Sequence, residues 1–513
     1  MAQSTTGPRM GAGVAAAAVA LGVVQLTAAF FSPAADARTA VGTAVINLTP
    51  GPVKEWAIQT FGTADKLFLS VAVIAVIGVL AATAAIWERS RVPVGTLAFL
   101  AAAVAGCAAV LTRPGAGIVD IIPTLLGMAS GVAVLRVLTG RIDANETPPP
   151  QDTEDAQVDS GRRLSLLTFG IGGLGLLSGI AGVVINRRLH SVSGDRESFA
   201  LPSAPPASPV PADVTPQGVQ LPSFITPNGD FYRIDTALSV PQLARADFRL
   251  RIHGMVDREI TYTFADLAKF EPITKTVTLT CVSNPVGGNL ISNATWTGYR
   301  VADLLRDSGI HPDADMVLST SIDGFTAGTP VEALTDARES MLAIGMNGVP
   351  LPVEHGYPAR LVVPGLYGYV SATKWVVDLE LTRFDRAQAY WTKLGWSERG
   401  PIKTESRIDV PRDGQKVAKG PVTFGGVAWA QNRGVKGVEV RIDDGPWQPA
   451  RLGATYSNDT WRLWSFPWTA TQGGFHTVTA RATDNTGAVQ TEDQAPPAPD
   501  GATGWPAVSF EVA

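Results

Sequence analysis

The sequence is poor in cysteine and in charge, and each shortage excludes a class of protein. Only two cysteines, Cys107 and Cys281, occur among 513 residues, which is too few for a disulfide scaffold. Neither lies in a C-x-x-C or C-x-x-C-H motif, which excludes a zinc ribbon and a covalently attached c-type haem. With 41 Lys and Arg against 46 Asp and Glu, the net charge is −5. This balance argues against a nucleic-acid-binding protein, because such proteins present basic patches.

Charged residues make up only 17% of the chain, below the roughly 25% of an average soluble domain. Long apolar stretches account for the shortage, at residues 10–35, 67–87, 92–112, 114–135 and 164–186. Each is about as long as a helix needs to cross a hydrocarbon core of roughly 30 Å. Buried core helices are one alternative, and a cleaved signal peptide is another for the first stretch. Five stretches in succession favour five transmembrane helices within residues 1–190.

Arginines near the ends of these stretches predict their orientation, because short cytoplasmic loops are rich in Lys and Arg. Most of them fall on the side of the N-terminus: Arg9, Arg89, Arg91, Arg136, Arg141, Arg162 and Arg163. The pair Arg187-Arg188 departs from the pattern. Five spans then place the N-terminus in the cytoplasm and everything after residue 190 outside it. We expect a multi-pass cell-membrane protein in contact with lipid.

Residues 143–160 contain six acidic residues, three consecutive prolines and no basic residue. Such a segment predicts a disordered cytoplasmic loop. Arg162-Arg163 follow it, ahead of a Gly-rich and weakly hydrophobic stretch. This arrangement resembles a twin-arginine export signal placed inside the chain, although the pair could also be ordinary cytoplasmic anchors. A folded, cofactor-loaded domain downstream would favour export by the twin-arginine machinery.

The chain after the membrane region divides into a linker and two domains. Within 191–222 lie seven prolines, which predict an extended, semi-rigid spacer. Residues 223–395 mix strand-like and helix-like runs without β-α alternation, which indicates an α+β domain and not a doubly wound nucleotide-binding sheet. No G-x-G-x-x-G or Walker motif opens a helix there. Residues 400–513 contain short β-branched runs separated by turn clusters, which is typical of an immunoglobulin-like β-sandwich.

Cys281 is the first candidate for chemistry. A lone cysteine is often a small buried hydrophobe. Cys281, however, follows the strand-like run 276–280 and precedes a loop containing Asn-Pro and Gly-Gly, and such loops allow close backbone approach to a ligand. A thiolate there suits a soft redox metal or nucleophilic catalysis with a histidine base.

The second candidate is a Gly- and Pro-rich stretch, residues 352–375, that carries His355, Arg360 and Lys374. These three side chains could converge on a phosphate, with Arg giving a bidentate fork and Lys a point charge. The alternative is a surface strand pair with solvated cations.

The residues around both candidates resemble the sulfite oxidase family. The strings TLTCVSNPVGGNLISNATWTGYRVADLL and NGVPLPVEHGYPARLVVPGLYGYVSATKW are similar to that family's molybdopterin-binding domain. Residues 226–235 resemble the family's entry motif, and residues 406–411 and 499–505 resemble the start and end of its immunoglobulin-like dimerisation domain. The resemblance covers about 220–513 and leaves out the five apolar stretches.

The resemblance implies a site at matching positions. Cys281 would supply the single protein thiolate to molybdenum and be the catalytic residue. The residues implied to contact the cofactor are Asn228, Phe231, Tyr232, His355, Arg360, Ala372, Thr373 and Lys374, with Asp323, Gly324 and Phe325 as a further contact loop. A homodimer through the C-terminal domain is also implied.

One departure from the family pattern bears on the substrate. Animal and plant sulfite oxidases have an arginine four residues beyond the cysteine, and this chain has Pro285 there. Sulfite is therefore doubtful, and Trp296 and Tyr299 could wall a less charged pocket. We expect no haem in this chain, so electrons would leave to a separate cytochrome or quinone partner. The interpretation is an extracytoplasmic molybdenum oxidoreductase performing oxygen-atom transfer or related two-electron chemistry. A non-enzymatic binding or scaffold module with a degenerate cofactor site is the alternative.

Overall fold

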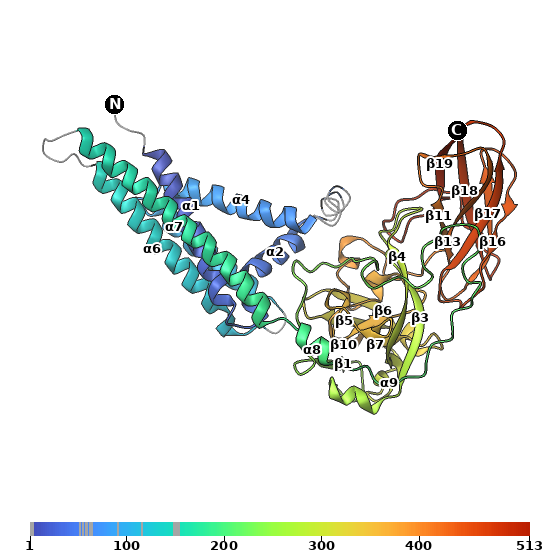
Figure 1. Cartoon of the computed structure of the whole chain (residues 1–513). Coiled ribbons are helices and arrows are strands. Elements are labelled where there is room, and N and C mark those ends of the chain that lie inside the picture. The colour runs from blue at the N-terminus through green and yellow to red at the C-terminus, as the bar shows by residue number, and fades with distance from the viewer. Residues whose placement is uncertain are drawn as a thin grey trace. The chain divides into compact units, whose positions relative to one another are not determined.

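A computed structural model describes residues 5–50, 53, 56, 60, 65–89, 92–113, 116–146 and 154–513 (Figure 1). The chain divides into two compact units. The first comprises residues 1–191 with 237–242, and the second comprises residues 192–236 with 243–513.

The first unit is helical, and five of its described helices are long and apolar enough to cross a membrane. Its helices are α1 Thr6–Ala28, α2 Ala37–Leu48, α4 Asp65–Ile86, α5 Val94–Leu111, α6 Ile122–Glu146 and α7 Glu154–Leu189, with the 3-10 turns η1 Pro33–Ala35 and η3 Ile118–Ile121. The prediction of five apolar helices is confirmed. The short helix α2 was not predicted; Asp36 caps its start by accepting the backbone N–H groups of Arg38 and Thr39 at 3.1 and 3.3 Å.

The predicted acidic loop 143–160 is shorter than expected. Helix α6 continues to Glu146 and helix α7 begins at Glu154, so both helices extend into the acidic segment. The extension at 154–160 contains Glu154, Ala156 and Gln157, which are good helix formers. The rest of the loop, residues 147–153, lies outside the described part of the chain.

Small residues let α7 pack closely on α1 (Figure 1). A Cβ atom added to Gly175 would lie 2.6 Å from the backbone of Ala18, and one added to Gly182 would lie 2.5 Å from the backbone of Gln25. Larger residues at these positions would force the helices apart. Gly175 and Gly182 therefore have a packing role in addition to lowering the hydrophobicity of the span.

The Pro-rich linker packs on the C-terminal domain. Residues 200–210 have no regular secondary structure, as their prolines predict. The Ser208 carbonyl accepts the Tyr456 hydroxyl at 2.8 Å, and the Asp213 carbonyl accepts the Ala454 N–H at 2.9 Å. An extended backbone leaves its carbonyls unpaired, so a neighbouring surface can bind them. This part of the linker is therefore bound to a neighbouring surface and is not a free spacer.

One mixed and one antiparallel sheet build the central α+β domain, which confirms the predicted class. Their orders are β2-β1-β10-β5-β6 and β3-β4-β7-β8, with β9 also pairing with β7. The strands are β1 Arg249–Gly254, β2 Ile260–Thr263, β3 Pro272–Thr280, β4 Ile291–Arg300, β5 Met316–Ser321, β6 Thr326–Pro330, β7 Met341–Met346, β8 Val349–Pro350, β9 Arg360–Val362 and β10 Val376–Thr382. Short helical segments connect them: α8 Ser193–Ser198, η4 Ala265–Lys269, α9 Val301–Arg306, α10 Val331–Thr335, η5 Val353–His355, η6 Gly368–Val370 and η7 Thr392–Leu394.

The C-terminal domain is a two-sheet β-sandwich, as predicted. One sheet has the order β11-β13-β17-β16 and the other β12-β19-β18-β14-β15. The strands are β11 Glu405–Val410, β12 Gln415–Val417, β13 Gly420–Trp429, β14 Val435–Ile442, β15 Gln448–Pro449, β16 Arg451–Leu452, β17 Arg462–Ala470, β18 Gly474–Asp484 and β19 Ala507–Val512. Inward-facing residues such as Phe424, Val440, Trp464 and Phe510 form its core, so the sandwich holds together without a cysteine pair.

Candidate functional site

Cys281 lies directly after β3, at the start of a closed loop. Its backbone N–H donates to the Leu290 carbonyl at 2.9 Å, and its carbonyl accepts the Asn284 N–H at 3.1 Å. Asn284 closes the loop further, because its Oδ1 accepts the Leu290 N–H at 2.8 Å. The thiol is free and 8% exposed. Burial raises the pKa of this thiol, so a bound cation would be needed to favour the thiolate.

The C-terminal sandwich holds the strand that ends at Cys281. Gln431 donates from Nε2 to the Thr278 carbonyl at 3.1 Å and to the Thr280 hydroxyl at 2.9 Å. The Trp461 N–H donates to the Thr278 hydroxyl at 2.8 Å. These groups are buried. The sandwich therefore fixes the base of the Cys281 loop.

An aromatic cluster stands beside this strand. The Phe231 ring stacks on Tyr232 with 5.4 Å between ring centroids. It also meets Trp296 and His355 edge to face, at 5.6 and 5.5 Å. The predicted site residues Phe231, Tyr232 and His355, which come from two distant parts of the sequence, are thus brought together around the Phe231 ring.

Asn228 joins this cluster through His355. The Asn228 carbonyl accepts a hydrogen bond from His355 Nε2 at 3.2 Å, and its Oδ1 accepts one from Asn347 Nδ2 at 2.7 Å. Burial, together with the positive charges of Arg360 and Lys374, lowers the pKa of His355 to about 4. The imidazole is therefore neutral at pH 7, with the proton on Nε2 and an acceptor at Nδ1.

Arg360 is the most unusual charge of the cluster, because it is 4% exposed and has no counterion among the described residues. Its guanidinium reaches only the carbonyls of Leu361, His355 and Ala372, at 3.3 to 3.4 Å, and lies 5.1 Å from the centre of the Trp296 ring. Among the described residues no carboxylate pairs with it. Burial lowers its pKa to about 10, which still leaves it charged at pH 7. A buried charge without a partner is costly, so this position suits an anion.

Lys374 differs from Arg360 in that it is already paired. Its Nζ donates to Asp235 at 2.8 Å and to the Glu354 carbonyl at 3.1 Å. Burial lowers the pKa of Lys374 to about 8, although Asp235 opposes this shift. An anion that approached Lys374 would compete with Asp235 for it.

Tyr232 connects the cationic cluster to the Cys281 loop. A Cβ atom placed on Gly368 would lie 3.9 Å from the Tyr232 hydroxyl and 4.0 Å from the Thr280 carbonyl. Burial raises the pKa of Tyr232, and the charge of Cys281 adds to this rise while that of Arg360 opposes it. The glycine at 368 therefore leaves open space where Tyr232 and the end of β3 meet.

The remaining predicted residues are placed less uniformly. Ala372 is half-buried and its carbonyl contacts Arg360, but the Thr373 hydroxyl is fully buried against Ser319 at 2.7 Å. Asp323, Gly324 and Phe325 form the turn between β5 and β6, and the Phe325 ring contacts Tyr390 at 5.9 Å. No recorded contact joins that turn to Cys281 within the described residues. Its cofactor role stays a prediction.

Trp296 and Tyr299, the two aromatic residues proposed as pocket walls, lie in different core clusters of the domain. Trp296 lies fully buried under Arg360, whereas Tyr299 is buried in the other core cluster of the domain. The predicted export pair, Arg162 and Arg163, lies exposed on α7.

Three residues of the site were missed from the sequence. Asn284 carries a buried Nδ2 without a hydrogen-bond partner, and its position three residues after Cys281 was the available signal. Asp235 lies at the end of the recognised 226–235 motif. Asn347 is the first residue of the recognised string that runs to Trp375, but its hydrogen bond to Asn228, 119 positions away, cannot be seen in the sequence.

The central domain matches the family described as "Oxidoreductase molybdopterin binding domain" over residues 237–391, and residues 405–490 match "Bacterial Ig domain". Human mitochondrial sulfite oxidase is 30% identical over 290 residues, which is 47% of this chain and 52% of the human protein. The uncharacterized oxidoreductase YuiH of Bacillus subtilis is 31% identical over 153 residues, which is 30% of this chain and 74% of that protein. The chain belongs to the sulfite oxidase family of molybdopterin-dependent oxidoreductases.

This family member spans about half the length of the curated mammalian sulfite oxidases that it matches. Among solved structures, the sulfane dehydrogenase SoxCD from Paracoccus pantotrophus resembles it with 28% identity and a TM-score of 0.47, over 53% of this chain and 75% of that chain.

The residues of this family member fit a molybdenum–pterin cofactor. Such a group carries a phosphate, and Arg360 offers a buried guanidinium without a counterion. Asn284 Nδ2 is a buried hydrogen-bond donor without an acceptor among the described residues. The Cys281 thiol is a soft ligand, and no group of three or more His, Cys, Asp or Glu side chains gathers within the described residues. A metal here would therefore bring most of its ligands with the cofactor.

Proposed function

We propose that this chain is a membrane-anchored molybdenum-cofactor oxidoreductase whose catalytic region lies outside the cytoplasm. The observation that carries the proposal is the buried guanidinium of Arg360, which has no counterion among the described residues, together with Tyr232, which lies within electrostatic range of both Arg360 and Cys281. Bound there, the cofactor would supply two-electron redox chemistry, including oxygen-atom transfer. Electrons would pass to a separate cytochrome or quinone partner.

The chain's own residues bind and orient the cofactor in this proposal. Arg360 pairs with the phosphate, and neutral His355 accepts a hydrogen bond at Nδ1 while Asn228 holds its Nε2–H. Cys281 contributes the one protein thiolate. Phe231 and Tyr232 give a flat apolar wall against which a pterin ring can stack.

The substrate is small and not clearly sulfite. Pro285 is exposed in the loop after Cys281, where relatives of the sulfite oxidase type carry an arginine. Proline has neither a charge nor a backbone donor, so this position cannot bind an anion. We therefore place sulfoxides and N-oxides before sulfite in a substrate screen.

The direct test of catalysis replaces each cysteine in turn. We expect Cys281→Ser to reduce turnover by at least about a hundredfold, because a serine hydroxyl is a poor substitute for a soft thiolate ligand. Cys107→Ser is the matched control, since Cys107 lies in α5, and it should keep wild-type turnover. Turnover is measured with an artificial electron donor or acceptor on the full chain in detergent. Equal turnover in all three proteins would refute the catalytic role of Cys281, and the absence of turnover from all three would leave a binding module as the remaining function.

A further inference from the structure

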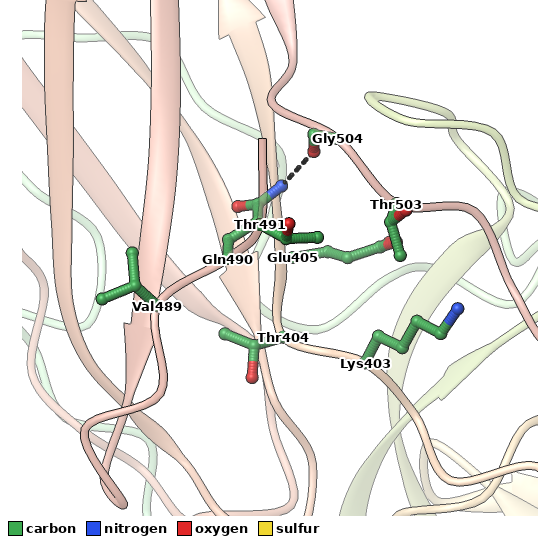
Figure 2. A pocket seen from close by; sticks show the side chains of 8 residues that line it. All are labelled: Lys403, Thr404, Glu405, Val489, Gln490, Thr491, Thr503 and Gly504. Carbon is green, nitrogen blue, oxygen red and sulfur yellow. Dashed lines mark hydrogen bonds between the residues drawn. The ribbon is translucent and has the colours of Figure 1, made fainter. Parts of the chain in front are cut away.

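A second cavity lies in the C-terminal sandwich, where the start of β11 meets the segment that leads into β19 (Figure 2). Its walls include Lys403, Glu405, Val489, Gln490 and Gly504, and its volume is about 210 Å³. A single water needs only about 15 Å³ by this kind of measure, whereas sites for drug-sized ligands begin near 300 Å³. The cavity is therefore the size of a small molecule.

Glu405 is an unpaired acid in this cavity. Its side chain is 4% exposed, and its Oε1 has no hydrogen-bond partner. No described residue forms an ion pair with it. Figure 2 shows this side chain extending in the direction of Thr503, which lies on another wall. A buried carboxylate without a donor is costly to ionise, and a cation bound beside it would offset that cost.

The other polar groups of the cavity are already satisfied. Lys403 Nζ donates to the Asp500 carboxylate at 2.9 Å and to the Gly501 carbonyl at 2.7 Å. Gln490 donates to the Gly504 carbonyl at 2.8 Å, and its Oε1 accepts the Ser406 hydroxyl at 2.8 Å. The walls are thus held in place without a ligand. The charges of Lys403 and Asp500 offset each other, so the cavity carries a net negative charge whenever Glu405 is ionised.

A metal ion is a poor match for this arrangement. Ca²⁺ takes six to eight oxygen ligands and is usually bound by several carboxylates, but Glu405 is the one carboxylate among the lining residues. An organic cation needs only one acceptor carboxylate and can fill the remaining volume with its own atoms. The Val489 side chain, which is 49% exposed, adds an apolar surface to the wall of the cavity.

We propose that this cavity binds a small organic cation whose ammonium or amidinium group donates hydrogen bonds to Glu405. The site is separate from the one assigned to the cofactor and does not depend on the proposed function. One contact links it to the cofactor domain: the backbone N–H of Lys403 donates to the Tyr367 hydroxyl at 3.4 Å, and Tyr367 precedes Gly368 in the loop beside Tyr232.

The test uses the full chain in detergent and a phosphate buffer, because amine buffers are themselves organic cations. Ethanolamine is the probe, and its neutral and anionic counterparts, ethylene glycol and glycolate, are the comparison compounds. K⁺ and Mg²⁺ test inorganic cations. Binding is followed by ligand-observed NMR titration and by the shift of the unfolding temperature.

The variants separate binding from folding. Glu405→Gln keeps the shape and removes the charge, and it should weaken ethanolamine binding at least about tenfold, as expected for the loss of a hydrogen bond to a charged group. Val489→Trp leaves Glu405 in place and narrows the cavity mouth, so it should also weaken binding. Glu492→Gln is the matched control, because Glu492 is an exposed carboxylate nearby, and it should bind as wild type.

Saturable binding of ethanolamine alone, lost in Glu405→Gln and kept in Glu492→Gln, is the expected result. Equal binding of ethanolamine by wild type and Glu405→Gln would overturn the proposal. So would the absence of saturable ethanolamine binding, or a Glu405-dependent response to K⁺ or Mg²⁺ without one to ethanolamine. Molybdenum content has no part in this outcome, so a failed cofactor test and a failed cation test are distinguishable.

Discussion

At the scale of single residues, Arg360 gives the sharpest prediction. Arg360→Met keeps an apolar stem and removes a buried charge that has no counterion. We expect the cofactor-free variant to unfold at the same temperature as wild type or higher, because an unpaired buried charge destabilises the fold. Pterin content should nevertheless fall at least about tenfold, since charge-assisted hydrogen bonds to phosphate are strong.

Two measurements check that stability is kept while pterin content falls. They are the thermal unfolding temperature and the amount of pterin released per chain by acid oxidation. Arg251→Met is the control, because Arg251 pairs with Glu259 at 2.9 Å in a half-exposed position. Wild-type pterin content in Arg360→Met would contradict the role assigned to Arg360.

Glu405 predicts a dependence of stability on pH. Burial raises the pKa of Glu405 to about 8, against an ordinary value of 4.5, while Lys403 opposes the rise. The folded state therefore holds this proton more tightly than the unfolded state, so its contribution is full below pH 4.5 and is lost as pH rises through 8. Glu405→Gln lacks this loss and should be more stable than wild type at pH 9, by up to roughly 4 kcal/mol.

The difference between the two proteins should nearly vanish at pH 5. Thermal unfolding at pH 5 and pH 9 in buffers without amines measures it. If the stability difference between wild type and Glu405→Gln were the same at pH 5 and pH 9, the pKa of Glu405 would not be raised. The carboxyl would then have a partner or be exposed to solvent.

Sequence reasoning reached some of these residues and not others. Cys281, His355 and Arg360 stand in Gly- and Pro-rich strings that marked them as candidates, and the family resemblance implied their roles. The pairing of Lys374 with Asp235 joins residues 139 positions apart, so no local pattern could reveal it. In the sequence, Glu405 looks like an ordinary polar residue at the start of a strand. Its isolation follows from how β11 meets the C-terminal segment, which is a property of the tertiary fold.

At the scale of elements, the arginine pair on α7 carries the export hypothesis. Changing Arg162 and Arg163 together to lysine keeps both charges at the start of the apolar stretch. If the pair is a twin-arginine signal, residues 223–513 should fail to reach the outside, because that machinery reads the signal itself and not charge alone. Protease accessibility of the C-terminal region in intact cells measures this.

The same helix supplies the control. Arg187→Lys with Arg188→Lys makes the identical change in the last turn of α7 and should leave export unchanged. Normal export of the Arg162/Arg163 variant would show that these residues are ordinary anchors.

Element boundaries were less predictable than element types. Strand β10 begins only at Val376, because Lys374 forms a bridge with Arg360 and Trp375 adopts a positive φ of 51°. Both features belong to the site and interrupt a run of residues that otherwise suits a strand. Helix α2 was missed because twelve residues are too few to cross a membrane, and only the Asp36 cap marks its start.

At the scale of the whole molecule, the apolar helices, the central α+β domain and the C-terminal sandwich each have a distinct role. The sandwich, which looks like an accessory domain in the sequence, holds the strand that presents Cys281 through Gln431 and Trp461. The long apolar helices would anchor the chain to a membrane. Hydropathy and length reveal these helices directly, whereas the clamp on Cys281 depends on contacts about 150 residues apart or more.

The central claim is that Cys281 and Arg360 hold a molybdenum–pterin cofactor. The most direct measurement is the molybdenum and pterin content of the purified full chain, for wild type, Cys281→Ser and Arg360→Met. We predict about one molybdenum and one pterin per wild-type chain, a metal centre altered in Cys281→Ser, and loss of both metal and pterin in Arg360→Met. Absence of both from wild-type chain, produced in cells that make the cofactor, would contradict the account.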